Sequence, residues 1–369
     1  MSRPRTTLSS WLQHEASRFA DPGALLVGLC QRLVEANVPL HGAALAISAL
    51  HPLVAGSTFT WQRDRPDALE MPRFHGMTGE VAGASDTGAV DPRDGRRLDL
   101  AIAFSDGGSP TLSLTSDRPE GFDRAQRARL RRIARLLAAP LEIVVTRQTA
   151  ATLLATYLGR RSGTRVLAGA VQRGDGETIH AVLWYSDLRG FTALSESLPR
   201  DRVIALLNAH FERLAAPIKA FGGEVLKFMG DGLLAIFPTE AGGAAQACDR
   251  ALRAARGARA GMAALNSERM AAGESPLTFG LALHLGDVMH GNIGAPDRLD
   301  FTVIGPAVNI VSRLEALCKE LDMPMLVSAA FASACMEDLE PIGSYPLPGV
   351  TQPAEVFTLA ELRSGAREG

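Results

Sequence analysis

Acidic and glycine residues follow an apolar run in the middle of the chain. In the segment WYSDLRGFT, a strand-like run ends at Asp187, and Gly190 then allows a ligand to approach the backbone closely. A helix is predicted to begin near Thr192, where free backbone N–H groups favour phosphate. This arrangement could hold a metal ion and a polyphosphate together. The alternative is an Asp that serves only as a helix N-cap.

A second acidic residue lies at the tip of a predicted hairpin. Apolar runs at 224–229 and 233–237 flank Gly-Asp-Gly, so Asp231 is expected in a tight turn where its carboxylate can face a metal ion. Lys227 lies within the first run, and a lone lysine on a buried strand face is costly unless it is paired or bound to a ligand. The alternatives are a turn-forming Asp and an edge-strand Lys that discourages aggregation.

A third polar group lies on a predicted helix. The run 300–304 ends at Gly-Pro, and the helix that follows carries Asn309 and Arg313 on one face because they are four residues apart. A guanidinium fork beside a neutral amide donor suits a polyanion such as a triphosphate. A solvated polar stripe is the alternative.

Short strands and helices alternate around these residues. The predicted strands cover 180–185, 224–229, 233–237, 277–285, 288–293, 300–304, 325–328 and 354–359. The predicted helices cover 193–198, 202–221, 243–267 and 307–321. Because the alternation has no strict parallel pattern, it favours an α+β fold with helices on one face of a mainly antiparallel sheet.

Residues 1–120 give weaker signals. A helix is predicted at 22–36 and a loop rich in Gly, Asp and Pro from about 63 to 97. The strand-like runs cover 43–48, 98–104 and 110–115. This combination indicates a small α/β sensor-like domain.

Residues 121–177 are predicted to be a helical linker. Its apolar residues recur at steps of three and four, which suits a partner helix: Leu130, Ile133, Leu137, Leu141 and Val144. Pro140 disfavours one straight helix, and a polar connector is expected at 160–177. The domain that carries the polar residues then covers 178–362, and residues 363–369 form a tail.

The composition limits the class of protein. Net charge is −2 and 46% of residues are hydrophobic, which indicates packed cores and no general attraction for nucleic acid. Six arginines between 124 and 135 are expected to form a solvated helix face, with a membrane or nucleic-acid patch as the alternative. No apolar run reaches the ~18 residues of a spanning helix, and no secretory signal is evident, so a cytoplasmic protein is expected. The dispersed cysteines are predicted to be reduced thiols: Cys30, Cys248, Cys318 and Cys335.

Together, the three polar segments resemble the catalytic domain of class III adenylate and guanylate cyclases. The order of the motifs matches, and Asp231 follows Asp187 by 44 positions. The turn 291–294 is also similar to the one before that family's dimerisation arm. The resemblance covers 178–362 and implies a ferredoxin-like (βαββαβ-type) domain with a mainly antiparallel sheet.

The resemblance also implies roles for individual residues. Asp187 and Asp231 would bind two Mg²⁺ or Mn²⁺ ions in each active site, assisted by the backbone carbonyl of Leu188. Asn309 and Arg313 would be the catalytic pair that orients the ribose and stabilises the transition state. The substrate-binding residues would be Lys227, Thr302, Gly190, Phe191 and Thr192.

The purine-selecting pair favours ATP. The ammonium of Lys227 can donate to adenine N1, and the hydroxyl of Thr302 can accept from the 6-amino group, whereas guanylate cyclases usually carry Glu at the lysine position. A Thr at 302 resembles a bacterial subgroup in which bicarbonate stimulation is often reported, and a response here is a hypothesis. Pro348 stands where many family members have a triphosphate-binding Lys.

The implied function is conversion of ATP to 3′,5′-cyclic AMP and pyrophosphate. Since the family takes its metal ligands from one subunit and its purine and transition-state residues from the other, a homodimer is implied. Residues 1–120 resemble GAF-like regulatory modules and would bind an unidentified ligand. The alternatives are a catalytically weak nucleotide-binding regulator, a guanylate cyclase, and an adaptor that binds DNA or membrane through the arginine-rich helix. No nucleic-acid or membrane partner is expected.

Overall fold

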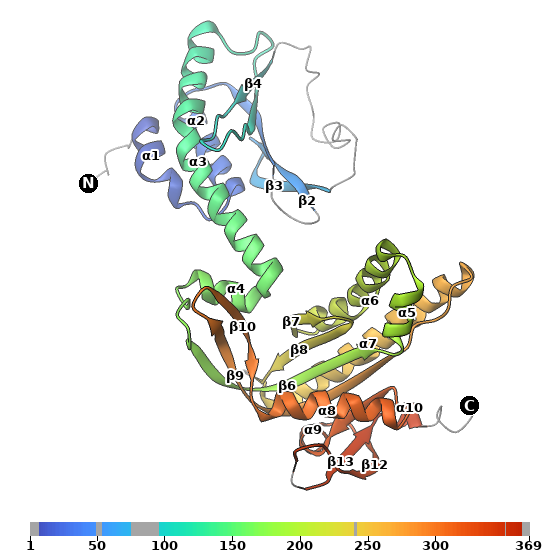
Figure 1. The fold of residues 1–369 in the computed structure, drawn as a ribbon. Helices are drawn as coiled ribbons and strands as arrows, with labels where there is room; N and C mark the ends of the chain where they lie inside the picture. Colours follow the sequence, from blue (N-terminus) through green and yellow to red (C-terminus); the bar gives the residue numbers. More distant parts are fainter. Residues whose placement is uncertain (1–6, 49–53, 75–95, 240–241, 351, 364–369) are drawn as a thin grey trace. The chain divides into compact units, whose positions relative to one another are not determined.

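The structure is a computed structural model that describes residues 7–48, 54–74, 96–239, 242–350 and 352–363. The chain divides into two compact units, Met1–Leu153 and Leu154–Gly369 (Figure 1). Each unit has hydrophobic core clusters of its own, as expected of separate domains.

The first unit is built on a five-stranded antiparallel sheet with the order β3-β2-β1-β5-β4. Its strands are β1 (Leu40–Ser48), β2 (Val54–Gln62), β3 (Arg65–Phe74), β4 (Arg97–Ala101) and β5 (Thr111–Ser116). The helical elements before the sheet are α1 (Leu8–His14), η1 (Ala16–Arg18) and α2 (Pro22–Glu35). In α2, Asp21 caps the first turn by accepting from the N–H of Ala24 at 2.8 Å, and Pro22 occupies the first helical position.

The predicted loop from 63 to 97 was wrong in its first part. Strand β3 occupies Arg65–Phe74, and β2 before it was also missed. β3 tolerates Pro72 because it is the edge strand of the sheet, where a missing N–H donor costs little. The rest of the predicted loop, 75–95, lies outside the described residues.

Helix α3 (Arg124–Leu158) is one continuous helix through Pro140, the residue that disfavoured one straight helix in the sequence. A proline inside a helix costs about 3 kcal/mol, whereas each large apolar side chain that is buried contributes about 1.5–3 kcal/mol. The apolar seam of α3 is buried in the core of the first unit: Leu130, Ile133, Leu137, Leu141 and Val144. The seam therefore packs within the core of its own unit, and the prediction that it packs against a partner helix was wrong.

The second unit is an α+β domain, as predicted, with the strand order β12-β13-β11-β9-β6-β8-β7 and β10 paired to β9. Its strands are β6 (Gly176–Leu188), β7 (Glu224–Met229), β8 (Gly232–Pro238), β9 (Phe279–Ala295), β10 (Arg298–Ile304), β11 (Met325–Ser328), β12 (Glu340–Tyr345) and β13 (Ala354–Thr358). Its helices are α4 (Arg160–Leu167), α5 (Phe191–Ser197), α6 (Arg200–Ala220), α7 (Gly243–Ala271), α8 (Pro306–Glu320), α9 (Ala329–Ala334) and α10 (Ala360–Arg363). Apart from the parallel pair β9–β11, the described pairings in this sheet are antiparallel.

Helices cover both faces of this sheet, and the expectation of helices on one face was wrong. Val182 and Trp184 of β6 pack into the core beneath α6 and α7. Ala181 and Leu183 point to the opposite face and pack beneath α8. A strand that is buried on both faces has a continuous apolar run, which is why β6 shows no alternation of apolar and polar residues.

Strand β9 is a single strand, although two were predicted on either side of Gly286. It pairs continuously with β6, from Gly291 opposite Gly176 to Phe279 opposite Leu188. Hydrogen bonding along this whole length outweighs the tendency of Gly286 to interrupt a strand. A Cβ at Gly286 would lie 2.9 Å from the Cβ of Ala307. The glycine therefore allows α8 to pack closely on the strand.

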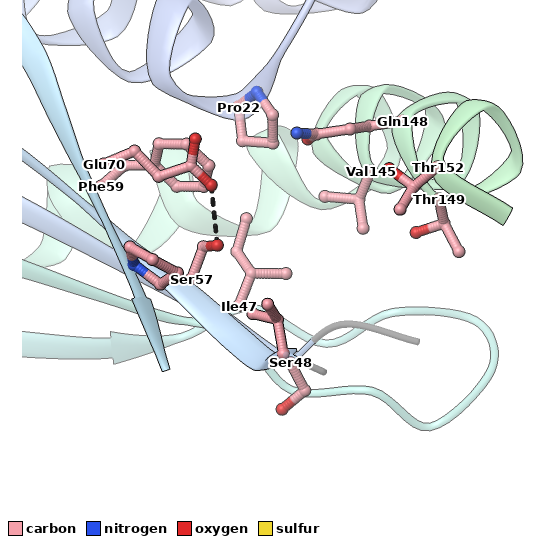
Figure 2. Close-up of a pocket in the computed structure, with 12 residues that line it drawn as sticks. Pro22, Ile47, Ser48, Ser57, Phe59, Glu70, Val145, Gln148, Thr149 and Thr152 are labelled. Atoms are coloured by element: carbon pink, nitrogen blue, oxygen red, sulfur yellow. Dashed lines mark hydrogen bonds between the residues drawn. The ribbon is translucent and has the colours of Figure 1, made fainter. Parts of the chain in front are cut away.

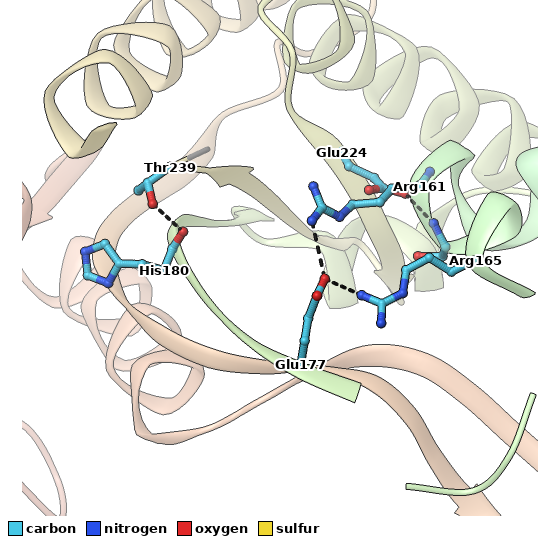
Figure 3. A network of polar contacts seen from close by, with 7 residues as sticks. Arg161, Arg165, Glu177, His180, Glu224 and Thr239 are labelled. Carbon is cyan, nitrogen blue, oxygen red and sulfur yellow. Dashed lines mark hydrogen bonds and ion pairs between the residues drawn. The ribbon is translucent and has the colours of Figure 1, made fainter. Parts of the chain in front are cut away.

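The segment predicted as a connector contains helix α4, whose start is fixed to the sheet. Glu224 of β7 accepts from the backbone N–H of Arg161 at 3.0 Å and of Ser162 at 3.4 Å (Figure 3). A Cβ at Gly159 would collide with the Glu224 carboxylate. Glu177 of β6 forms ion pairs with Arg161, at 3.4 Å, and with Arg165. Two strands thus anchor the first turn of α4, which satisfies N–H groups that a helix start leaves unpaired.

None of the helices within the described ranges has both the length and the apolar character needed to cross a lipid bilayer.

Candidate active site

The structure brings Asp187 and Asp231 together. Strands β6 and β8 pair with Ser186 opposite Leu233, so the end of β6 lies beside the turn that precedes β8. The two side chains are close enough for Asp231 to raise the pKa of the Asp187 carboxyl. A Cβ at Gly232 would lie 3.4 Å from Asp187 Oδ1, so the glycine leaves the carboxylate room. The predicted convergence of the two aspartates is therefore present.

The surroundings of Asp187 disfavour its charged form. Burial, and then the nearby charge of Asp231, raise the pKa of Asp187 to about 7, and Glu315 acts in the same direction. The guanidinium of Arg189 opposes the shift. A bound divalent cation would relieve the repulsion between the two carboxylates, so the pair fits a metal site.

The aspartates would be the principal side-chain ligands of such a site. Within the described ranges, no cluster of three or more His, Cys, Asp or Glu side chains could enclose a metal ion. The remaining ligands would have to be water, backbone carbonyls or substrate phosphates. Mg²⁺ is commonly held in this way, by one or two carboxylates together with phosphate oxygens.

The raised pKa of Asp187 makes the stability of the metal-free protein depend on pH. Because its folded pKa of about 7 exceeds 3.8, the ordinary pKa of an aspartate side chain, the folded state binds this proton more tightly. Its contribution to the free energy of unfolding is fully present below about pH 4 and is lost as pH rises through about 7. We expect Asp231→Asn to lower the pKa of Asp187, and so to flatten this dependence and stabilise the protein at about pH 8.

Thermal unfolding in EDTA between about pH 5 and pH 8 measures this effect. Asp297→Asn is the control, since Asp297 is exposed in the turn between β9 and β10. Parallel pH curves for the wild type and Asp231→Asn would contradict the coupling.

Lys227 on β7 reaches the strand that carries Thr302. Its Nζ lies 3.1 Å from Asp300 Oδ2 on β10. The Thr302 hydroxyl is buried and has no hydrogen-bond partner among the residues that the structure describes. A buried hydroxyl without a partner is costly, which is consistent with a group that awaits a ligand. Sequence reasoning missed Asp300, although residues two apart on a strand share a face.

Asn309 and Arg313 lie on α8 as predicted. Asn309 is exposed and Arg313 is half-buried. The Arg313 guanidinium lies against Gly349, where a Cβ would be 3.2 Å from Nη2 and where φ is +68°. Glycine suits that position on both counts. The turn that contains Pro348 therefore packs beside Arg313, a contact that sequence reasoning missed.

Sequence reasoning also missed an ion pair between Arg189, the residue after β6, and the buried Glu315 of α8. Arg189 Nη1 lies 3.2 Å from Glu315 Oε1, and the two side chains are 21% and 8% exposed. A Cβ at Gly280 would collide with both side chains. Gly280 is the partner of Asp187 in the β6–β9 ladder. The pair thus joins the end of β6, which carries Asp187, to α8, which carries Arg313. The missing side chain at Gly280 leaves room for it.

The turn after Asp187 has the predicted strand–glycine–helix form. Gly190 adopts a left-handed conformation, with φ +67°, at the N-cap of α5. Phe191 packs against the core, whereas Thr192 is exposed. Contact between this turn and a phosphate stays a prediction.

The second unit is similar in sequence to known proteins. Residues 176–359 match the family model described as adenylate and guanylate cyclase catalytic domain. Adenylate cyclase 1 of Rhizobium meliloti is 27% identical over 175 residues, covering 47% of this chain and 26% of that protein. An adenylate cyclase of Anabaena cylindrica is 32% identical over 162 residues, covering 43% of this chain and 31% of that protein. The chain thus spans less than a third of either relative.

Solved structures of cyclases are also similar. The adenylyl cyclase CyaB from P. aeruginosa has 27% sequence identity and a TM-score of 0.45, over 49% of this chain and 94% of that one. A bacterial light-regulated adenylyl cyclase has 22% identity and a TM-score of 0.53, over 72% of this chain and 86% of that one. The second similarity is one of fold alone.

Proposed function

Because residues 176–359 form a class III adenylate and guanylate cyclase catalytic domain, we propose that this chain is an adenylate cyclase. It would convert ATP to 3′,5′-cyclic AMP and pyrophosphate. The observation that carries the proposal is the meeting of the Asp187 and Asp231 carboxylates beside the hairpin that bears Lys227. Lysine at this position favours adenine, since its ammonium can only donate and adenine N1 can only accept.

In the proposed site, Asp187 and Asp231 would hold two Mg²⁺ or Mn²⁺ ions, and the Leu188 carbonyl would assist. When bound, the ions supply Lewis acidity and charge neutralisation for an in-line displacement. Gly190, Phe191 and Thr192 lie at the turn where backbone N–H groups can face the triphosphate. This assignment is consistent with the mutual repulsion of the two carboxylates described above.

The other residues bind the base and the reacting phosphate. Lys227 donates to adenine N1, and the partnerless hydroxyl of Thr302 accepts from the 6-amino group. Lys227 must then turn from Asp300 to the base, or contact both. Arg313 donates to the α-phosphoryl oxygens, where fixed charge lowers the barrier most, and Asn309 orients the ribose.

The reaction forms one bond and breaks one bond at the α-phosphorus. The ribose 3′-oxygen attacks that phosphorus as the bond to the bridging oxygen of the β-phosphate breaks, and pyrophosphate leaves. The proton of the 3′-hydroxyl passes to water, since no side chain of the site is assigned as a general base. The role of the protein is therefore positioning and electrostatic stabilisation.

We propose that the active enzyme is a homodimer with two equivalent sites. Exposed apolar residues on the second unit support this. Met289 and Ile304 pair directly on the β9–β10 hairpin and are 44% and 45% exposed. Phe228 of β7 is 52% exposed. Apolar residues gathered on exposed strands are typical of a protein–protein interface.

Product analysis tests the proposal. Purified protein is incubated with ATP or GTP and with Mg²⁺ or Mn²⁺, and the products are separated by chromatography. We expect cyclic AMP from ATP with the wild type and none with Asp231→Ala. Cyclic GMP as the main product would favour a guanylate cyclase. Nucleotide binding without a cyclic product would favour a regulator that has lost catalysis.

A further inference from the structure

A cavity of about 160 Å³ lies in the first unit, between the inner face of the sheet and α3 (Figure 2). Ile47, Phe59 and Val145 form part of its apolar wall. Ser57 and Glu70 supply polar groups on the opposite side of the cavity from Gln148. An apolar cavity of ~150 Å³ accommodates one benzene molecule, so the occupant has the size of a single ring.

Glu70 is an exposed residue of the edge strand β3, and it lies on the same face of the sheet as core residues. It pairs in register with Phe59 of β2, which pairs in turn with Leu45 of β1. Directly paired residues point to the same face, and both Phe59 and Leu45 are buried in the core. The Ser57 hydroxyl donates to Glu70 Oε1 at 2.7 Å, which holds the carboxylate toward the cavity (Figure 2).

The charge of this carboxylate is not matched by a cation of the cavity wall. Among the described residues that line the cavity, Glu70 has an ionisable side chain, and the others are apolar or neutral polar residues. Arg73 is near in sequence but pairs with Gly56, and a Cβ at Gly56 would lie 2.7 Å from its Nη2. Since side chains alternate along a strand, Arg73 belongs to the other face.

We propose that this cavity binds a small organic amine whose apolar body is about the size of one ring. The ammonium group forms a charge-assisted hydrogen bond with Glu70, and the ring packs against Ile47, Phe59 and Val145. The proposal does not depend on the cyclase reaction, since all of these residues belong to the first unit.

The occupant would contact α3 near its C-terminal end. Val145, Gln148, Thr149 and Thr152 line the cavity at helical spacing and share one face of α3. The helix continues from there to Leu158. A bound amine would therefore order the part of α3 that leads out of the first unit.

Three ring compounds that differ in charge test the proposal on the full chain at neutral pH. They are benzylamine, benzyl alcohol and benzoate, and their affinities are measured by calorimetry and ligand-observed NMR. We expect benzylamine to bind about tenfold more tightly than benzyl alcohol, because a hydrogen bond between charged groups contributes about this much. Benzoate is expected not to bind, since Glu70 repels it.

Two variants separate the contribution of the Glu70 charge to ligand affinity from the contribution of the cavity volume. Glu70→Gln should weaken benzylamine about tenfold and leave benzyl alcohol unchanged. Thr149→Phe should fill the cavity and weaken both, and circular dichroism reports whether each variant is folded. Glu35→Gln at the exposed end of α2 is the matched control and should change neither affinity.

Several results would overturn the proposal. One is benzoate that binds as well as benzylamine. Another is a folded Glu70→Gln variant with unchanged amine affinity, or the absence of binding by every probe at millimolar concentration. A variant that only self-associates would assign Glu70 to protection of the sheet edge instead, because inward charges on edge strands prevent aggregation.

Discussion

We expect Asp187→Ala and Arg313→Ala each to lower the proposed cyclase activity by about a thousandfold, and we expect a mixture of the two variants to recover about a quarter of the wild-type rate. The single losses follow from removing a metal ligand or a transition-state cation, each of which contributes on this scale. The recovery follows from shared sites, because one mixed dimer contains one site made wholly of intact halves. Random exchange makes about half of the dimers mixed, and each has one working site of two.

The control is a mixture of Asp187→Ala with Asp231→Ala. Both changes fall in the same half of the proposed site, so every composite site retains a defect and no recovery is expected. Affinity capture through a tag on only one of the two variants establishes that subunits exchange in both mixtures. Recovery in the control mixture, or none in the test mixture once mixed dimers have formed, would refute the division of the site between subunits.

Glu315→Ala is expected to lower the free energy of unfolding of the second unit by about 3–5 kcal/mol. The change leaves the partly buried Arg189 guanidinium without its counter-charge, and breaking one partner of such a pair is costly on this scale. Replacing both partners, as Arg189→Met with Glu315→Leu, should cost much less because no charge is then stranded.

Hydrogen exchange of α8 amides at increasing urea, followed by mass spectrometry, measures the second unit separately from the first. Glu320→Ala, at the exposed end of the same helix, should change the free energy by no more than about 0.5 kcal/mol. If Glu315→Ala is no more destabilising than Glu320→Ala, the ion pair contributes little to the site.

The sequence predicted the aspartate pair well because its signals are local. An apolar run that ends at Asp187 and a Gly-Asp-Gly turn at Asp231 each specify their own backbone, and the ordered motifs imply that they meet. The Arg189–Glu315 pair could not be predicted in this way. It depends on Gly280, which lies opposite Asp187 only through strand pairing, and pairing across about 90 residues leaves no local pattern.

The first unit was predicted less well for a related reason. The segment that becomes β3 contains prolines and charges, which indicate a loop unless its place at the edge of the sheet is known. Pro140 disfavoured one straight helix, but α3 continues through it because its apolar residues pack in the core with those of the sheet. In both cases tertiary packing outweighed local preference.

The anchoring of α4 sets a boundary for building chimaeras. Glu224 and Glu177 of the second unit bind the first turn of α4 through hydrogen bonds and an ion pair. Gly159 and α4 therefore belong to that unit. A foreign input domain should therefore be grafted upstream of Gly159. A fusion made at residue 176, where the family match begins, would remove α4. Glu177 and Glu224 would then lose their partners on that helix.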